Sequence, residues 1–220
     1  MIADLLIHPA VPIFIGSILV YFFRNAANTL SIVSLIFALL ILLFKTNIFY
    51  LEYFSYTKLA FLFCLVYLII GIIGALFSMY QNNSTEKFLI LFYIASAISV
   101  IFSGDFITFY IFWELMAISA TFIIWSSNES KSYIAGMRYL LIHLFGGIIL
   151  LIGIIGLYTH TNDLSLRIIL LDNWYSYLIL IGILLNAGGP PFSSWISDAY
   201  PEGSYSSTVF LSAYTTKTAV

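Results

Sequence analysis

The chain has 220 residues, of which 62% are hydrophobic and 8% are charged, and its mean hydropathy is +1.05. Soluble domains carry about 25% charged residues, so this composition excludes a soluble globular protein. The formal charge of −2 carries little weight for a lipid-embedded surface. A single cysteine, Cys64, excludes an intrachain disulfide and a cysteine-based metal cluster.

We therefore predict an all-α integral membrane protein, a single membrane domain over residues 1–220 with about eight transmembrane helices. A helical span needs roughly 20 apolar residues. The first six predicted spans cover, in chain order, residues 5–23, 29–44, 59–80, 88–103, 106–125 and 133–158. The polar stretch 159–173 follows as the longest loop and is a candidate for a short surface helix.

The seventh predicted span begins at Trp174 and is interrupted by Gly188, Gly189, Pro190 and Pro191. Two prolines remove two backbone donors and the glycines lower helix stability, so the helix must break there. Inside a membrane such a break must be buried in protein or line a wet cavity, and broken helices often mark ion pathways. The alternative is a helix that simply ends at the membrane surface, and spacing alone favours neither.

An eighth helix is predicted to begin near Tyr205 and to reach Val220 after roughly 15 residues, short of a full span. We therefore expect the chain to be cut within this helix and to need a separate polypeptide that supplies further helices.

Lysines and arginines weakly favour an outside N-terminus under the positive-inside rule. That orientation places Arg24, Lys87, Lys131 and Arg138 inside, against Lys45, Lys58 and Arg167 outside.

Glu114 lies near the middle of the fifth predicted span. A carboxylate at a helix centre costs about 2.5–3.5 kcal/mol on insertion scales, so an intramembrane glutamate is a candidate proton-exchanging group. The alternative is a glutamate that only hydrogen-bonds neighbouring helices.

Three basic side chains are further candidates for a proton path. His143 lies in the middle of the sixth predicted span, where imidazole can shuttle protons or simply bond a neighbouring helix. Arg138 is one turn inside the same span and can reach towards the interface. Lys217 is about twelve residues into the last helix, a depth that favours a relay role over the alternative of a lysine that extends to the interface.

The stretch from Asn186 to Glu202, Asn-Ala-Gly-Gly-Pro-Pro-Phe-Ser-Ser-Trp-Ile-Ser-Asp-Ala-Tyr-Pro-Glu, carries a family resemblance together with the later Ser-Ala and Thr-Lys. It resembles the antiporter-like membrane subunits of respiratory complex I and of Mrp-type sodium/proton antiporters, and most of all the D-type Mrp subunits. The resemblance covers the N-terminal half of such subunits. It implies that Glu114 and Lys217 belong to a central proton relay and that Arg138 matches the family's basic residue before a tyrosine.

Asn186 is the main departure from the family pattern, because many members carry the relay lysine at this position. An asparagine can hydrogen-bond water but cannot titrate. The resemblance therefore implies a proton- or sodium/proton-translocating subunit, with a non-transporting structural subunit or degenerate fragment as the alternative.

No enzyme signature, phosphate loop or paired-histidine haem pattern occurs in the sequence, so we expect no metal, no cofactor and no redox site in this chain. The expected partners are other membrane subunits of an antiporter or complex I-like assembly and the lipid bilayer, without nucleic acid. The expected location is the inner (cytoplasmic) membrane, crossed several times.

Overall fold

A computed structural model describes residues 8–44, 50–51, 54–81, 83–127, 129–190 and 192–219. Most of these residues are helical, which confirms the predicted fold class. The strands described are two short antiparallel ones, β1 (Tyr50–Leu51) and β2 (Phe54–Ser55), in the connection where the sequence showed no span. Among the described residues, five helices are long and apolar enough to cross a membrane, and two shorter apolar helices accompany them.

The helices follow the predicted spans closely. They are α2 (Ala10–Phe22), α3 (Ala27–Phe44), α4 (Lys58–Phe77), α5 (Ser84–Ile101), α6 (Phe106–Trp125), α7 (Ser130–Thr161), α8 (Trp174–Ala187), α9 (Ser194–Ala199) and α10 (Tyr205–Ala219). Short 3-10 turns occur at η1 (Arg24–Ala26), η2 (Ser78–Tyr80) and η3 (Tyr200–Glu202).

The prediction of a short surface helix in the loop 159–173 is wrong. Helix α7 continues to Thr161, and residues 162–173 contain no helix. Asp163 instead accepts hydrogen bonds from the backbone and the hydroxyl of Ser165. The backbone of Ser165 forms an isolated antiparallel β-bridge with Asp105. Short polar side chains that bond nearby backbone compete with helix formation, which explains why this stretch forms turns.

Side-chain caps fix where several helices begin. Thr57 accepts the Ala60 N–H at the start of α4, and Asn83 accepts the Glu86 N–H at the start of α5. Asp105 accepts two N–H groups, from Ile107 and Thr108, at the start of α6. Each cap satisfies backbone donors that the first helical turn leaves free.

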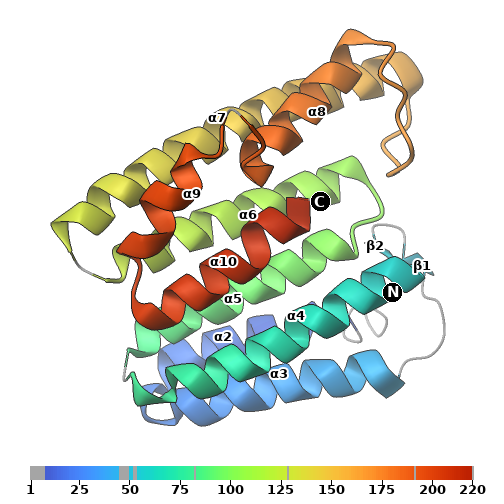
Figure 1. Ribbon diagram of the computed structural model, residues 1–220. Coiled ribbons are helices and arrows are strands. Elements are labelled where there is room, and N and C mark those ends of the chain that lie inside the picture. The colour runs from blue at the N-terminus through green and yellow to red at the C-terminus, as the bar shows by residue number, and fades with distance from the viewer. Residues whose placement is uncertain are drawn as a thin grey trace.

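The helices run roughly antiparallel in a layered bundle (Figure 1). Helices α7 and α8 pair on one side, α2, α3 and α4 form the opposite side, and α5, α6 and α10 lie between them. Helix α5 is the most deeply buried span, and its small residues Ala95, Ser96 and Ala97 are fully buried. The C-terminal helix α10 therefore packs into the bundle, against α4, α5, α6 and α8.

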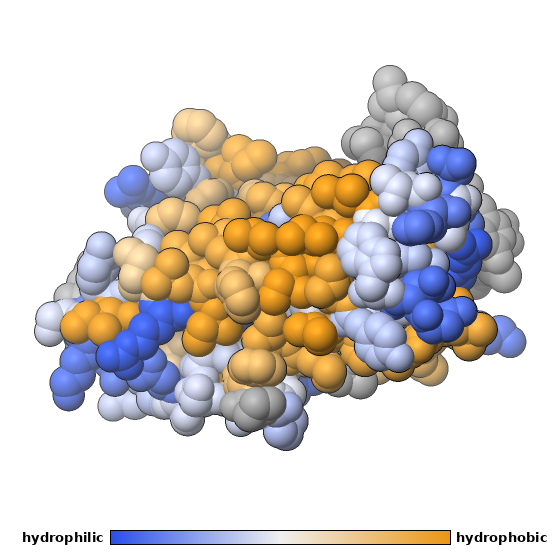
Figure 2. Space-filling model, turned by 90° about the horizontal axis from the view of Figure 1, so that it is seen from above, coloured by the Kyte–Doolittle hydropathy of each residue, from blue (hydrophilic) through white to orange (hydrophobic). Residues whose placement is uncertain are grey.

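The surface of the bundle carries an apolar band with polar side chains gathered at both ends (Figure 2). Large exposed apolar side chains on several helices supply it, including Phe37 on α3, Ile73 on α4 and Phe145 on α7. Exposed apolar surface of this extent is unfavourable in water and suits contact with lipid. The chain is a multi-pass membrane protein.

Candidate functional site

Glu114 lies near the middle of α6, and one of its carboxylate oxygens, Oε1, is buried inside the bundle. Within the described part of the chain, this oxygen has no hydrogen-bond partner, and no ion pair joins Glu114 to a basic side chain. Leaving a buried polar group unsatisfied costs about 1–3 kcal/mol. The position is therefore suited to a group that exchanges a proton or binds water.

Two consecutive glycines on α7 make room for this carboxylate. A Cβ atom at Gly147 would lie 2.9 Å from Cδ of Glu114 and would overlap Oε1. A Cβ atom at Gly146 would lie 2.7 Å from Oδ1 of Asn186 on α8. The glycine pair thus allows a carboxylate from α6 and an amide from α8 to approach the same short segment of α7.

Asn186 is 0% exposed, and neither its Nδ2 nor its Oδ1 has a hydrogen-bond partner among the described residues. It occupies the second-last position of α8, immediately before the break. An amide offers both donors and acceptors, so it can hold water molecules without titrating.

His143 lies one helical turn before Gly147 on the same face of α7 and is also buried. Its Nδ1 is 3.1 Å from the carbonyl oxygen of Tyr139, and its ring stacks on that tyrosine with 3.9 Å between centroids. The other ring nitrogen, Nε2, has no partner among the described groups. His143 therefore holds one ring nitrogen in place and leaves the other free for water or a proton.

Helix α8 ends at Gly188, which has φ 70° in the left-handed region that favours glycine. The Gly189 N–H donates to Leu184 O and the Gly188 N–H to Leu185 O, the two bonds of a Schellman cap. The short helix α9 then packs against α7. The break predicted from Gly188, Gly189 and Pro190 is therefore present, while Pro191 lies outside the described residues.

Trp195 of α9 ties the broken segment to the histidine. Its Nε1 donates to Leu185 O across the break, at 3.2 Å. Its ring meets the His143 ring edge-on, with 4.6 Å between centroids. Trp195 thus satisfies a backbone carbonyl at the break and also contacts His143.

Arg138 lies away from the Glu114 cluster, on an exposed part of α7. Its Nη1 pairs with the carboxylate of Asp198 on α9, at 3.0 Å. Exposed ion pairs contribute about 0–1 kcal/mol, so this pair chiefly positions α9 against α7.

Lys217 is also separate from the Glu114 cluster. It is exposed near the end of α10, and its Nζ donates to Ser212 O at 2.5 Å. It lines a groove together with residues of α4, α5 and α6, among them Tyr67 and Phe109. In the described structure no hydrogen bond or ion pair joins Lys217 to Glu114.

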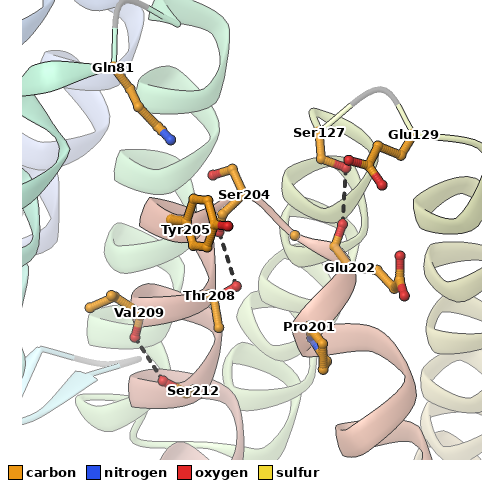
Figure 3. A pocket seen from close by; sticks show the side chains of 11 residues that line it. Gln81, Ser127, Glu129, Pro201, Glu202, Ser204, Tyr205, Thr208, Val209 and Ser212 are labelled. Carbon is orange, nitrogen blue, oxygen red and sulfur yellow. Dashed lines mark hydrogen bonds between the residues drawn. The ribbon is translucent and has the colours of Figure 1, made fainter.

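A pocket of about 640 Å³, lined by both polar and apolar side chains, opens where the α6–α7 connection meets η3 and the start of α10 (Figure 3). Ser127, Glu129 and Glu202 lie on one side of it, and Gln81 and Ser204 on the other. Ser204, Thr208 and Ser212 recur every four residues along its α10 side, so their hydroxyls share one helix face. The pocket thus brings two carboxylate side chains, Glu129 and Glu202, to an opening at this end of the bundle.

Among the predicted site residues, the structure thus brings Glu114, His143 and Asn186 to one segment of α7, and it places Arg138 and Lys217 elsewhere. Sequence reasoning did not identify Asn186 and Glu114 as the side chains that contact Gly146 and Gly147, nor Trp195 as the residue that bonds across the break. Trp195 lies within the stretch quoted for the family resemblance, so the sequence did point to this residue. The contact at Gly146 involves residues far apart in the sequence and could not be predicted from the residues around it.

Comparison with known proteins supports the same family. Residues 103–220 match the model of the family described as NADH:quinone oxidoreductase/Mrp antiporter, transmembrane. The chain is 30% identical to the A-type Na(+)/H(+) antiporter subunit of Alkalihalophilus pseudofirmus over 64% of its own length and 20% of that protein. It is 28% identical to NADH-ubiquinone oxidoreductase chain 2 of Dictyostelium citrinum over 66% of its length and 34% of the relative.

Solved structures show the same fold. A chain of the Mrp complex from Dietzia superposes with a TM-score of 0.86 at 19% identity, covering 100% of this chain and 47% of the other. A chain of respiratory complex I from Thermus thermophilus gives 0.85 at 16% identity, covering 96% and 51%. The chain therefore spans about half of these structures and a fifth to a third of those curated relatives. With more than half of its residues matched, the chain belongs to the NADH:quinone oxidoreductase/Mrp antiporter transmembrane family.

Proposed function

We propose that this chain is a proton- or sodium/proton-translocating subunit of a multisubunit membrane complex, with Glu114 as its central proton-exchanging group. The observation that carries this proposal is the buried, unpaired Oε1 of Glu114 against Gly147. The names of the relatives, which include a sodium/proton antiporter subunit and an oxidoreductase chain, support the same function class.

In this proposal, water connects the groups that the protein leaves unpaired. Glu114 Oε1 and the Asn186 amide lie against Gly147 and Gly146. His143, one turn earlier on α7, has an Nε2 that is unpaired among the described residues. Buried water typically makes about three hydrogen bonds to such groups. Glu114 accepts and releases the proton, His143 passes it towards the break in α8, and Asn186 orients the water between them.

The pocket beside Glu129 and Glu202 is the proposed entrance from one side, since its acids attract cations. Lys217 is proposed as a second titratable member of the path, on α10. Arg138 holds α9 through Asp198 and thereby supports the broken segment.

Glu114→Gln tests the proposal. The amide has nearly the same size but cannot exchange a proton, so proton or sodium transport in inverted membrane vesicles is expected to fall to background. The amount of inserted protein should stay at the wild-type level. Asp172→Asn, which changes an exposed loop carboxylate, is the matched control and should transport normally. Wild-type rates for Glu114→Gln would contradict the proton-exchanging role.

The second candidate function is a structural subunit that does not transport. Asn186 favours it, because this fully buried position holds an amide that cannot titrate, where many members of the resembled family carry the relay lysine. If the chain is a structural subunit, Glu114→Gln should leave transport by the complex unchanged. Loss of the whole chain should disrupt assembly. The same vesicle assay therefore separates the two functions.

A further inference from the structure

A second polar cavity, of about 550 Å³, opens where the end of α2 meets the starts of α3 and α5. Two segments of the chain line it: residues 24–28, with Arg24, Asn25 and Asn28, and the first turn of α5, with Ser84 and Lys87. The pocket therefore combines two cations, two amides and a hydroxyl. It is distinct from the Glu114 cluster and from the pocket beside Glu202.

Lys87 is a buried cation that forms no ion pair within the described residues. Its side chain is 6% exposed, and Nζ donates to Asn28 Oδ1 and to the carbonyl oxygen of Gln81. Both acceptors are neutral, and an ammonium group has three donors. Within the described residues, no ion pair satisfies this charge, and a buried charge is costly unless it is paired.

The neighbouring acid, Glu86, acts on Lys87 through its charge but forms no ion pair with it among the described residues, and its carboxylate makes its hydrogen bonds elsewhere. Its Oε1 accepts hydrogen bonds from Ser204 Oγ at 2.5 Å and from Ser206 Oγ at 2.7 Å. Successive helical residues point about 100° apart, so Glu86 and Lys87 serve different surroundings. The two neutral acceptors use two of the three donors of the Lys87 ammonium group, so one donor is left for a ligand in the cavity.

The rest of the lining suits the same kind of ligand. Arg24 supplies a second, exposed guanidinium, which lies 5.9 Å from the ring centre of Tyr21. Ser84 is the first residue of α5, so one helix N-terminus reaches the cavity. Helix N-termini and arginines both favour phosphate oxygens.

We propose that this cavity binds the phosphate group of an anionic phospholipid. A lipid source is favoured over free phosphate because Phe22 and Phe23, next to Arg24, are exposed large aromatic side chains. Aromatic residues at this position suit the boundary between headgroups and acyl chains. The phosphate then contacts Arg24 and Lys87 while its acyl chains lie along the exposed apolar face of α2.

The test uses the full chain, extracted in neutral detergent with any partner subunits that remain bound. Its thermal unfolding is measured with added phosphatidylglycerol, phosphatidylcholine or inorganic phosphate, and retained lipid is counted by native mass spectrometry. Phosphatidylglycerol is expected to raise the melting temperature more than phosphatidylcholine does, and inorganic phosphate is expected to reduce this difference by competition.

Two variants locate the site. Arg24→Gln and Lys87→Gln should each weaken phosphatidylglycerol binding about tenfold or more, as expected for a lost charge-assisted hydrogen bond. Lys131→Gln, which removes an exposed cation at the start of α7, should bind as the wild type does. If Lys87→Gln fails to fold, Arg24→Gln carries the test, because Arg24 is exposed.

Three outcomes decide the proposal. Selective stabilisation by phosphatidylglycerol that Arg24→Gln removes supports it. Stabilisation by inorganic phosphate without any preference for phosphatidylglycerol assigns the site to free phosphate and overturns the lipid source. Equal behaviour of all lipids and variants overturns the site itself. None of these readouts depends on transport, so the outcome is independent of the function proposed for Glu114.

Discussion

At the scale of single residues, the candidate site depends as much on missing side chains as on charged ones. Gly146 and Gly147 let Asn186 and Glu114 approach α7 more closely than any residue with a Cβ atom would permit. His143 on the same helix adds a buried ring nitrogen without a partner among the described groups. The glycines therefore belong to the site even though they carry no chemistry.

Gly147→Ala is predicted to disturb Glu114 directly. Overpacking of a buried contact costs about 1–3 kcal/mol, and here the new methyl group overlaps the carboxylate. We expect a lower melting temperature in detergent and reduced transport. Adding Glu114→Ala to this variant removes the overlapping atoms, so the double variant should be more stable than the sum of the two single effects implies. Strict additivity would show that the contact is absent.

Lys217→Gln is predicted to separate function from folding. Lys217 Nζ donates to Ser212 O on the exposed side of α10, and a bond at such an exposed position contributes little to stability. The melting temperature should therefore stay at the wild-type value. Transport in inverted vesicles should fall if Lys217 titrates during turnover, and full transport with Lys217→Gln would remove this residue from the proposed path.

At the scale of helices, the break in α8 is held by local chemistry on both sides. Gly188 and Gly189 close α8 with a Schellman cap, and Trp195 adds a side-chain donor to Leu185 O. The ion pair between Arg138 and Asp198 fastens α9 to α7. The broken segment is therefore a defined element of the fold, and its position is coupled to His143 through the Trp195 ring.

Trp195→Phe is predicted to weaken this coupling without removing the aromatic packing. The substitution removes the hydrogen bond to Leu185 O. The expected cost is only about 1 kcal/mol, because the Gly188 N–H still donates to the same oxygen. The melting temperature should fall slightly and transport should fall further. Trp174→Phe, at an exposed tryptophan of α8, is the control for the loss of an indole N–H. An equal effect of both variants would contradict a special role for Trp195.

The elements could be predicted from sequence because membrane spans follow from length and hydropathy. The prediction 106–125 coincides with α6, and the break predicted at Gly188 is where α8 is capped. Contacts between helices could not be predicted in the same way. Nothing in the sequence near Lys217 shows that its side chain lies on an exposed groove, because α10 has weak amphipathic patterning and its neighbours come from α4 to α6.

At the scale of the whole molecule, the antiparallel arrangement places the basic residues at two ends of the apolar band. Arg24, Lys87 and Lys131 lie near the starts of α3, α5 and α7, which share one end. Lys58 at the start of α4 and Arg167 in the loop after α7 share the other end, and Lys45 lies outside the described residues. The proposed phosphate site and the pocket beside Glu202 both belong to the first end, and they are proposed to take ions of opposite sign.

The positive-inside rule predicts that this first end faces the cytoplasm, since it carries the larger number of basic residues. The prediction is tested with single cysteines at Glu129 and Asp172, which lie at opposite ends, in a background where the buried Cys64 is replaced by alanine. A membrane-impermeant thiol reagent should label Glu129→Cys in inverted vesicles and Asp172→Cys in intact cells. The opposite pattern would reverse the orientation and place the acidic pocket on the outer side. Because the pocket is the proposed entrance, the same result also determines from which side protons reach Glu114.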